Sequence, residues 1–118
     1  MFNTEIKSIL AKAKSAQVIS ADYHQMTVGH SVVQLVKLVC RRDEEVITLS
    51  MSYDKQNSVL LAIQVFDAED MSNPKVTFQK HATRAEWIMN QDLAAQYQDV
   101  LGMMCRKAGH YFDLLNAD

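Results

Sequence analysis

Alternation of polar and apolar side chains near the middle of the chain constrains the fold more than any other feature. The segment VITLSMSY, residues 46–53, places an apolar residue at every second position from Ile47 to Tyr53. This period of two is that of a β-strand with one buried face and one solvated face. One-sided burial is typical of antiparallel sheets, so the sequence predicts an antiparallel sheet with one face in water.

Further strands are predicted before and after this segment. Residues 17–27 are rich in β-branched and aromatic side chains, and Gly29 is expected in the turn that follows them. The segment VLLAIQVF, residues 59–66, is apolar on both faces and predicts a central strand. The segment KVTFQKH, residues 75–81, predicts a short strand at an edge of the sheet.

The segment SVVQLVKLVCRR, residues 31–42, fits two structures. Ser31 and Gln34 have the spacing of a helical capping box. Its four valines favour a strand, because β-branched side chains lose rotamer freedom in a helix. The turn-like run RRDEE and a further strand follow it, which makes a hairpin natural. We therefore favour a strand and keep a helix as the alternative.

Helical periodicity appears at both ends of the chain. Residues 2–16 repeat apolar side chains with the 3.6-residue period of one helix face, and Asn3 or Thr4 can cap the start. The strongest helical pattern covers residues 83–109, where Thr83 and the glutamate three residues later form a capping box. The run MNQD, residues 89–92, predicts a break between a short helix and a longer one.

These elements and the length of the chain indicate the fold class. A chain of 118 residues has the size of one domain, so residues 1–118 are expected to form a single α+β domain. The expected arrangement is an N-terminal helix, a four- or five-stranded mainly antiparallel sheet and a long C-terminal helix packed on one face. Hydrophobic residues at 48% suffice for a core without metals or disulfides.

Cysteine content and the apolar stretches bear on the compartment. Cys40 and Cys105 form no CxxC pair, and free thiols are typical of a reducing compartment. The start MFNTEIKSIL has no basic region followed by an apolar run. The apolar stretches are far shorter than the roughly 20 residues that cross a bilayer. We therefore expect a cytoplasmic protein that does not contact a membrane.

The segment CRKAGHYF near the C-terminus has two interpretations, a chemical site or the end of a helix. Gly109 follows the last helical position, where a left-handed residue ends many helices. Arg106 and Lys107 lie in the last turn, where the helix dipole favours cations. Helix termination explains every residue except His110, so we favour it. The aromatic and leucine residues that follow are expected to fold back onto the sheet or the helix.

Chemistry-bearing residues form no recognisable catalytic pattern. A metal site needs several converging ligands, and the histidines at positions 24, 30, 81 and 110 have no metal-ligand spacing. With three scattered glycines the chain has neither a phosphate-binding loop nor a nucleophile elbow. We therefore predict no catalytic residues, no metal and no cofactor, and an enzyme is the less favoured class. A small enzyme that pairs Cys40 or Cys105 with a histidine remains an open alternative.

The distribution of charge leaves nucleic-acid binding as a second alternative. Residues 1–42 hold six cations and two acids, whereas residues 43–74 hold seven acids and one lysine. The net charge of −2 lacks the basic balance of most nucleic-acid-binding domains. Cations could nevertheless converge at one edge of the sheet. The candidates are Lys37, Arg41, Arg42, Lys80 and Arg84.

The favoured function is binding to another protein. A long amphipathic helix on a small sheet leaves surplus apolar surface, which a partner or a second copy must cover. We expect a small non-enzymatic protein that acts as an adaptor, a chaperone-like factor or an inhibitor, and forms a homodimer. The candidate contact residues are Trp87, Ile88, Leu93, Arg84, Arg106, Lys107, His110 and Tyr111.

Overall fold

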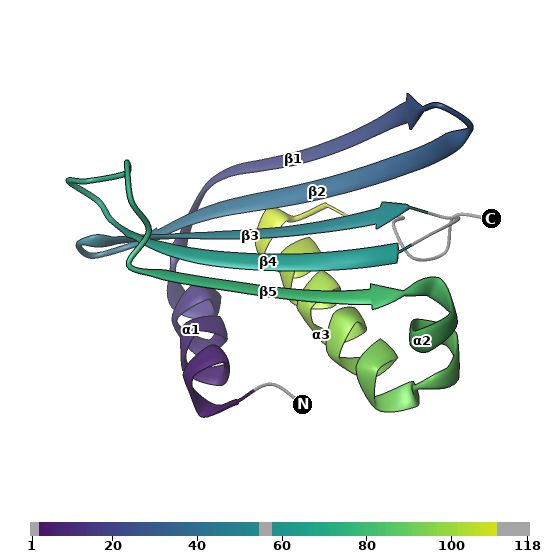
Figure 1. Ribbon diagram of the computed structural model, residues 1–118. Coiled ribbons are helices and arrows are strands. Elements are labelled where there is room, and N and C mark those ends of the chain that lie inside the picture. The colour runs from purple at the N-terminus through teal and green to yellow at the C-terminus, as the bar shows by residue number, and fades with distance from the viewer. Residues whose placement is uncertain (1–2, 55–57, 111–118) are drawn as a thin grey trace.

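The computed structural model describes residues 3–54 and 58–110, and shows one helix, five strands and two further helices along the chain (Figure 1). The helices are α1 (Thr4–Ser15), α2 (Arg84–Met89) and α3 (Gln91–Ala108). The strands are β1 (Gln17–Val28), β2 (Ser31–Arg42), β3 (Glu45–Asp54), β4 (Ser58–Asp67) and β5 (Val76–Thr83). The α+β class and the antiparallel sheet predicted from the sequence are confirmed.

The five strands follow one another across the sheet in chain order, and every neighbouring pair is antiparallel. Residues 31–42 form the strand β2, so the favoured interpretation of that segment is correct. Gly29, with φ of 63°, occupies the first position of the two-residue turn between β1 and β2. This conformation suits glycine because it has no Cβ. As predicted, β4 is an interior strand and β5 lies at an edge.

The two faces of the sheet have different surroundings. Figure 1 shows all three helices on the same side of the sheet, and among the described residues the opposite face carries no helix. On the helix side, alternate residues of β2, β3 and β4 are buried, as their period of two requires. This core includes Leu38, Leu49, Leu61 and Ile63 on the strands, all fully buried.

Side-chain caps fix where the helices begin. Asn3 Oδ1 accepts the Ile6 N–H at 2.9 Å at the start of α1, and Thr83 Oγ1 accepts the Glu86 N–H at 3.1 Å at the start of α2. Asn90 ends α2 and caps α3 through its side chain, which produces the predicted break. A cap oxygen stabilises a helix because the first amides have no partner within the helix.

The end of α3 matches the helix-termination interpretation. Gly109 has φ of 65°, in the left-handed region, and the N–H of His110 donates to the Cys105 carbonyl at 3.2 Å. These are features of a helix C-terminus closed by a left-handed glycine. Tyr111 and the aromatic and leucine residues after it were expected to pack back onto the domain, but they lie outside the described residues.

Candidate binding groove between α1 and α3

Two helical stripes face each other across a groove on the helix side of the molecule. The α1 stripe and the α3 stripe each take positions i, i+3, i+4 and i+7, the spacing that keeps side chains on one helix face. The groove has a volume of about 300 Å³. Its lining residues are Lys7, Leu10, Ala11 and Lys14 from α1, and Gln96, Asp99, Val100 and Met103 from α3.

The helices α1 and α3 are joined at their C-terminal ends. Lys107 Nζ donates to the Lys14 carbonyl at 3.1 Å and to the Ala16 carbonyl. The Lys14 carbonyl lies in the last turn of α1 and the Ala16 carbonyl follows it, where backbone acceptors lack helical partners. In Figure 1 the two helices approach each other toward these ends and separate toward their N-terminal ends. The two helices therefore diverge away from Lys107.

The floor of the groove is apolar and its α1 rim is basic. Val100 and Met103 are buried, while Leu10 is half-buried and Ala11 is exposed but short. Lys7 and Lys14 are exposed and two helical turns apart, which is about 10 Å along the axis. A ligand lying in the groove would meet aliphatic carbon below and two ammonium groups on one side.

The opposite rim, from α3, has one acidic residue and one uncharged polar residue. Asp99 is exposed, and Gln96 is held by Lys80, whose Nζ donates to Gln96 Oε1 at 2.7 Å. The two rims thus differ in charge, which gives the groove a basic side and an acidic side. An asymmetric rim fixes the orientation of a charged ligand more than it adds to affinity.

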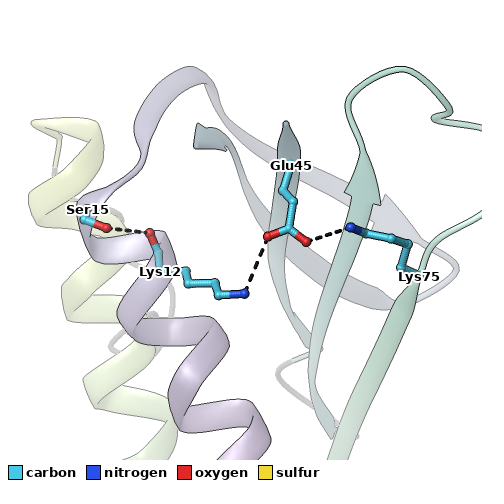
Figure 2. Close-up of polar contacts among 4 residues, drawn as sticks. All are labelled: Lys12, Ser15, Glu45 and Lys75. Atoms are coloured by element: carbon cyan, nitrogen blue, oxygen red, sulfur yellow. Dashed lines mark hydrogen bonds and ion pairs between the residues drawn. The ribbon is translucent and has the colours of Figure 1, made fainter. Parts of the chain in front are cut away.

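An ion-pair cluster holds α1 against the sheet. Figure 2 shows Glu45, at the start of β3, between Lys12 of α1 and Lys75, which precedes β5. The Glu45 carboxylate lies 3.5 Å from Lys12 Nζ and 2.7 Å from Lys75 Nζ. The hydrogen bond from Lys75, with the charge of Lys12, lowers the pKa of the Glu45 carboxyl below its ordinary value. The α1 wall is therefore held by contacts with distant parts of the chain.

The α3 wall is held by a buried tyrosine. Tyr97 is 1% exposed, and its hydroxyl donates to the Lys80 carbonyl of β5 at 2.8 Å. Burial, with the nearby charge of Glu86, raises the pKa of Tyr97 to about 12. Because the phenol stays protonated at neutral pH, the hydrogen bond between α3 and β5 is kept.

The partner-binding residues predicted from the sequence lie at both ends of α3. Near its start, Ile88 is 61% exposed, whereas Trp87 is half-buried with its ring against Tyr53 at a centroid distance of 6.2 Å. Leu93 also packs against the core, and Arg84 is half-buried on α2. Near its end lie Arg106, Lys107 and His110, and Tyr111 lies outside the described residues. Eighteen helical residues span about 27 Å, so the two groups do not form one surface.

The cations of the nucleic-acid alternative are also dispersed. Lys37 lies on the sheet face without helices, whereas Lys80 lies on the helix side and contacts Gln96. Arg41 and Arg42 end β2, and Arg84 begins α2 beyond the far end of β5. These five cations therefore lie on different faces of the sheet and near different ends of its strands.

The surroundings of Cys40 and of the described candidate metal ligands can be compared with those of a reactive centre. Cys40 is buried, and burial raises the pKa of its thiol while the charge of Lys107 partly opposes that change. A thiol is a poor nucleophile while it is protonated. Within residues 3–54 and 58–110, no three His, Cys, Asp or Glu side chains are grouped to hold a metal ion.

Sequence reasoning did not identify the groove, although its two stripes are visible in the sequence. The signal would have been the matched spacing of apolar and charged residues on α1 and α3. In the described part of the chain, no helix combines the length and apolar character needed to cross a bilayer. Comparisons with protein-family models, curated proteins and solved structures gave no match.

Proposed function

We propose that the protein acts without catalysis by binding another protein, and that the groove between α1 and α3 receives an acidic amphipathic helix of that partner. The observation that carries this proposal is the combination of an apolar floor with two exposed lysines on one rim. We place this activity in the cytoplasm, where the free thiols of Cys40 and Cys105 stay reduced.

The shape of the groove supports a helical occupant. A helix that binds in a groove inserts apolar residues spaced at i, i+3, i+4 and i+7 between two walls. The α1 and α3 stripes have this same spacing, so their ridges can alternate with those of a third helix. Lys107 joins α1 and α3 at their C-terminal ends, and the two helices diverge toward their N-terminal ends.

The charges on the rims support an acidic occupant and fix its orientation. Lys7 and Lys14 lie two turns apart, so Asp or Glu residues seven positions apart on the partner helix would face both. Asp99 on the other rim would repel acids there and favour neutral or basic residues. The preferred partner helix is thus acidic on its α1 side and apolar toward the floor.

A peptide selection tests the proposal and does not require an identified partner. A displayed library of random 16-residue peptides is selected for binding to the wild-type protein. The affinity of each recovered peptide is then measured for the wild type and for the Ala11→Trp variant. The tryptophan should fill the groove and weaken binding at least tenfold, because Ala11 is the short residue of the α1 stripe. The matched control is Ala95→Trp, which places the same side chain at an exposed position of α3 outside the groove lining.

The selected sequences and a charge reversal complete the test. The selected peptides should carry acidic residues seven positions apart beside an apolar stripe. The double variant Lys7→Glu, Lys14→Glu should bind these peptides about tenfold more weakly, since each exposed ion pair contributes up to about 1 kcal/mol. Lys37→Glu, on the opposite face of the sheet, is the control. Peptides that bind Ala11→Trp as well as wild type, or that are basic, would contradict the proposal.

A further inference from the structure

The edge strand β1 has an unusual surface for a strand at the border of a sheet. It is twelve residues long and pairs only with β2, with no described strand on its other side. Natural edge strands are commonly protected by lysine, proline or bulges. Here the only irregularity lies between Val18 and Ser20, and the pairing then continues without interruption to Val28. Residues 21–28 contain no lysine and no proline, and Met26 and Val28 are 46% and 58% exposed.

The register with β2 shows which backbone groups of β1 point toward the open side. The two-residue turn at Gly29 closes on Val28 and Ser31, so these residues form a hydrogen-bonded pair. Hydrogen-bonded and non-hydrogen-bonded pairs alternate along an antiparallel ladder. The backbone N–H and C=O groups that point away from β2 therefore belong to the odd-numbered residues Ala21, Tyr23, Gln25 and Thr27.

We propose that β1 pairs antiparallel with β1 of a second copy of this chain, about a two-fold axis that passes through Tyr23. The two sheets then continue into one sheet, and each copy offers the same strand to the other, as a two-fold interface requires. In this register Asp22 of one copy lies opposite His24 of the second copy, and Tyr23 lies opposite Tyr23. The axis repeats the Asp22–His24 pair on its other side.

Charge complementarity selects both the occupant and the register. Residues 21–28 contain one acidic residue, Asp22, and no lysine or arginine. The side chain opposite Asp22 therefore decides which registers are acceptable. Moving the axis by one residue, to Asp22, places Asp22 against Asp22, which is repulsive. Moving it by one residue in the other direction, to His24, places His24 against His24 and Asp22 against Met26. Of these three registers, only the axis at Tyr23 places an acid opposite a histidine in two pairs.

The neighbours on the same face are compatible with this register. Asp22 lies beside Lys37 of β2, and His24 lies beside Leu35, so no second acid faces the proposed pair from β2. Ser20 and Met26 would face each other at the outer pairs. This interface shares no residue with the groove lining.

The first test is the mass of the protein in solution, measured by sedimentation over a range of concentrations. The wild type should form a dimer of twice the 13.4 kDa chain mass as concentration rises. His24→Glu should weaken dimerisation about tenfold or more, because two cross-strand pairs become repulsive. Asp22→Lys combined with His24→Glu should restore the dimer, since it reverses both charges. A strict monomer, or a dimer indifferent to these changes, would overturn the proposal.

The second test uses the backbone. Gln25→Pro removes an N–H that points to the open side, and should abolish the dimer while the ladder with β2 is kept. Gln25→Ala is the matched control, since it removes the same side chain and its contact with Gln34 but keeps the N–H. Circular dichroism confirms that both variants fold. A dimer that persists in folded Gln25→Pro, or that is lost equally in Gln25→Ala, would show that β1 does not form the interface.

Cysteine cross-linking reads the register directly. Opposite residues of a non-hydrogen-bonded pair are close enough for a disulfide. A mixture of Asp22→Cys and His24→Cys copies should cross-link on oxidation, and each variant alone should not. Cross-linking of His24→Cys with itself would overturn the proposed axis.

Discussion

At the scale of single residues, Asp43 has a backbone conformation that glycine adopts more readily than aspartate. It lies in the turn between β2 and β3 with φ of 53°, in the left-handed region that glycine adopts without a steric cost. Left-handed geometry costs an L-residue roughly 1 kcal/mol. Asp43→Gly should therefore raise the free energy of unfolding by about 0.5 kcal/mol, which is less than the full steric cost because glycine gains entropy in the unfolded chain. Urea unfolding of both proteins measures the difference, and equal or lower stability would contradict it.

The buried phenol of Tyr97 makes stability depend on pH at the alkaline end. Its pKa is about 12 in the folded protein and about 10 in an unfolded chain. Between these values the folded state keeps a proton that the unfolded state loses, so stability falls as pH rises from about 10 toward 12.

Comparison with Tyr97→Phe isolates this effect. At pH 8 the variant should be about 1–2 kcal/mol less stable, because the Lys80 carbonyl loses its donor. At pH 11 the gap should narrow by about 1 kcal/mol, since one pKa unit corresponds to about 1.4 kcal/mol. Urea unfolding at the two pH values gives both numbers, and a gap independent of pH would show that the tyrosine titrates normally.

At the scale of elements, the sequence predicted structure that depends on neighbouring residues, but it did not predict contacts between distant parts of the chain. Caps and turns depend on a few neighbouring residues, so the ends of α2 and α3 at Thr83 and Gly109 were predictable. The strand at residues 31–42 needed its context, because its own composition also fits a helix. The groove depends on Lys107 reaching Lys14 across 93 positions of sequence, and no local pattern contains that contact.

A substitution at Lys107 therefore tests the contact that holds α3 against the end of α1. Lys107→Met keeps most of the unbranched apolar side chain but leaves the carbonyls at the end of α1 without their donor. We expect a loss of about 1–2 kcal/mol in the free energy of unfolding. Arg106→Met is the control, since Arg106 is the exposed neighbouring cation, and it should cost less than about 0.5 kcal/mol.

A second readout separates this contact from general destabilisation. The charge of Lys107 lowers the pKa of the Cys40 thiol against the larger effect of burial. Lys107→Met should therefore raise that pKa further and shift the pH profile of Cys40 alkylation to higher pH, measured with Cys105 replaced by serine. An unchanged profile would show that Lys107 does not face Cys40 in solution.

At the scale of the whole molecule, the two surfaces with proposed roles lie on different parts of the sheet. The groove lies on the helix side between α1 and α3, whereas the proposed dimer uses the open side of β1 within the plane of the sheet. A two-fold axis through Tyr23 gives each dimer two grooves. Two linked grooves bind a bivalent partner more tightly than one groove does, provided that the partner is long enough to reach both grooves.

Because the two surfaces share no residue, changes at them should be energetically independent. Distant substitutions without shared partners usually combine additively within about 0.5 kcal/mol. Ala11→Trp should leave the dimerisation constant unchanged, and His24→Glu should leave the affinity for a single selected peptide unchanged. The double variant should lose both activities by the amounts of the single variants. Coupling of more than about 1 kcal/mol in this cycle would mean that α1 and β1, which only Ala16 separates, transmit a change from one surface to the other.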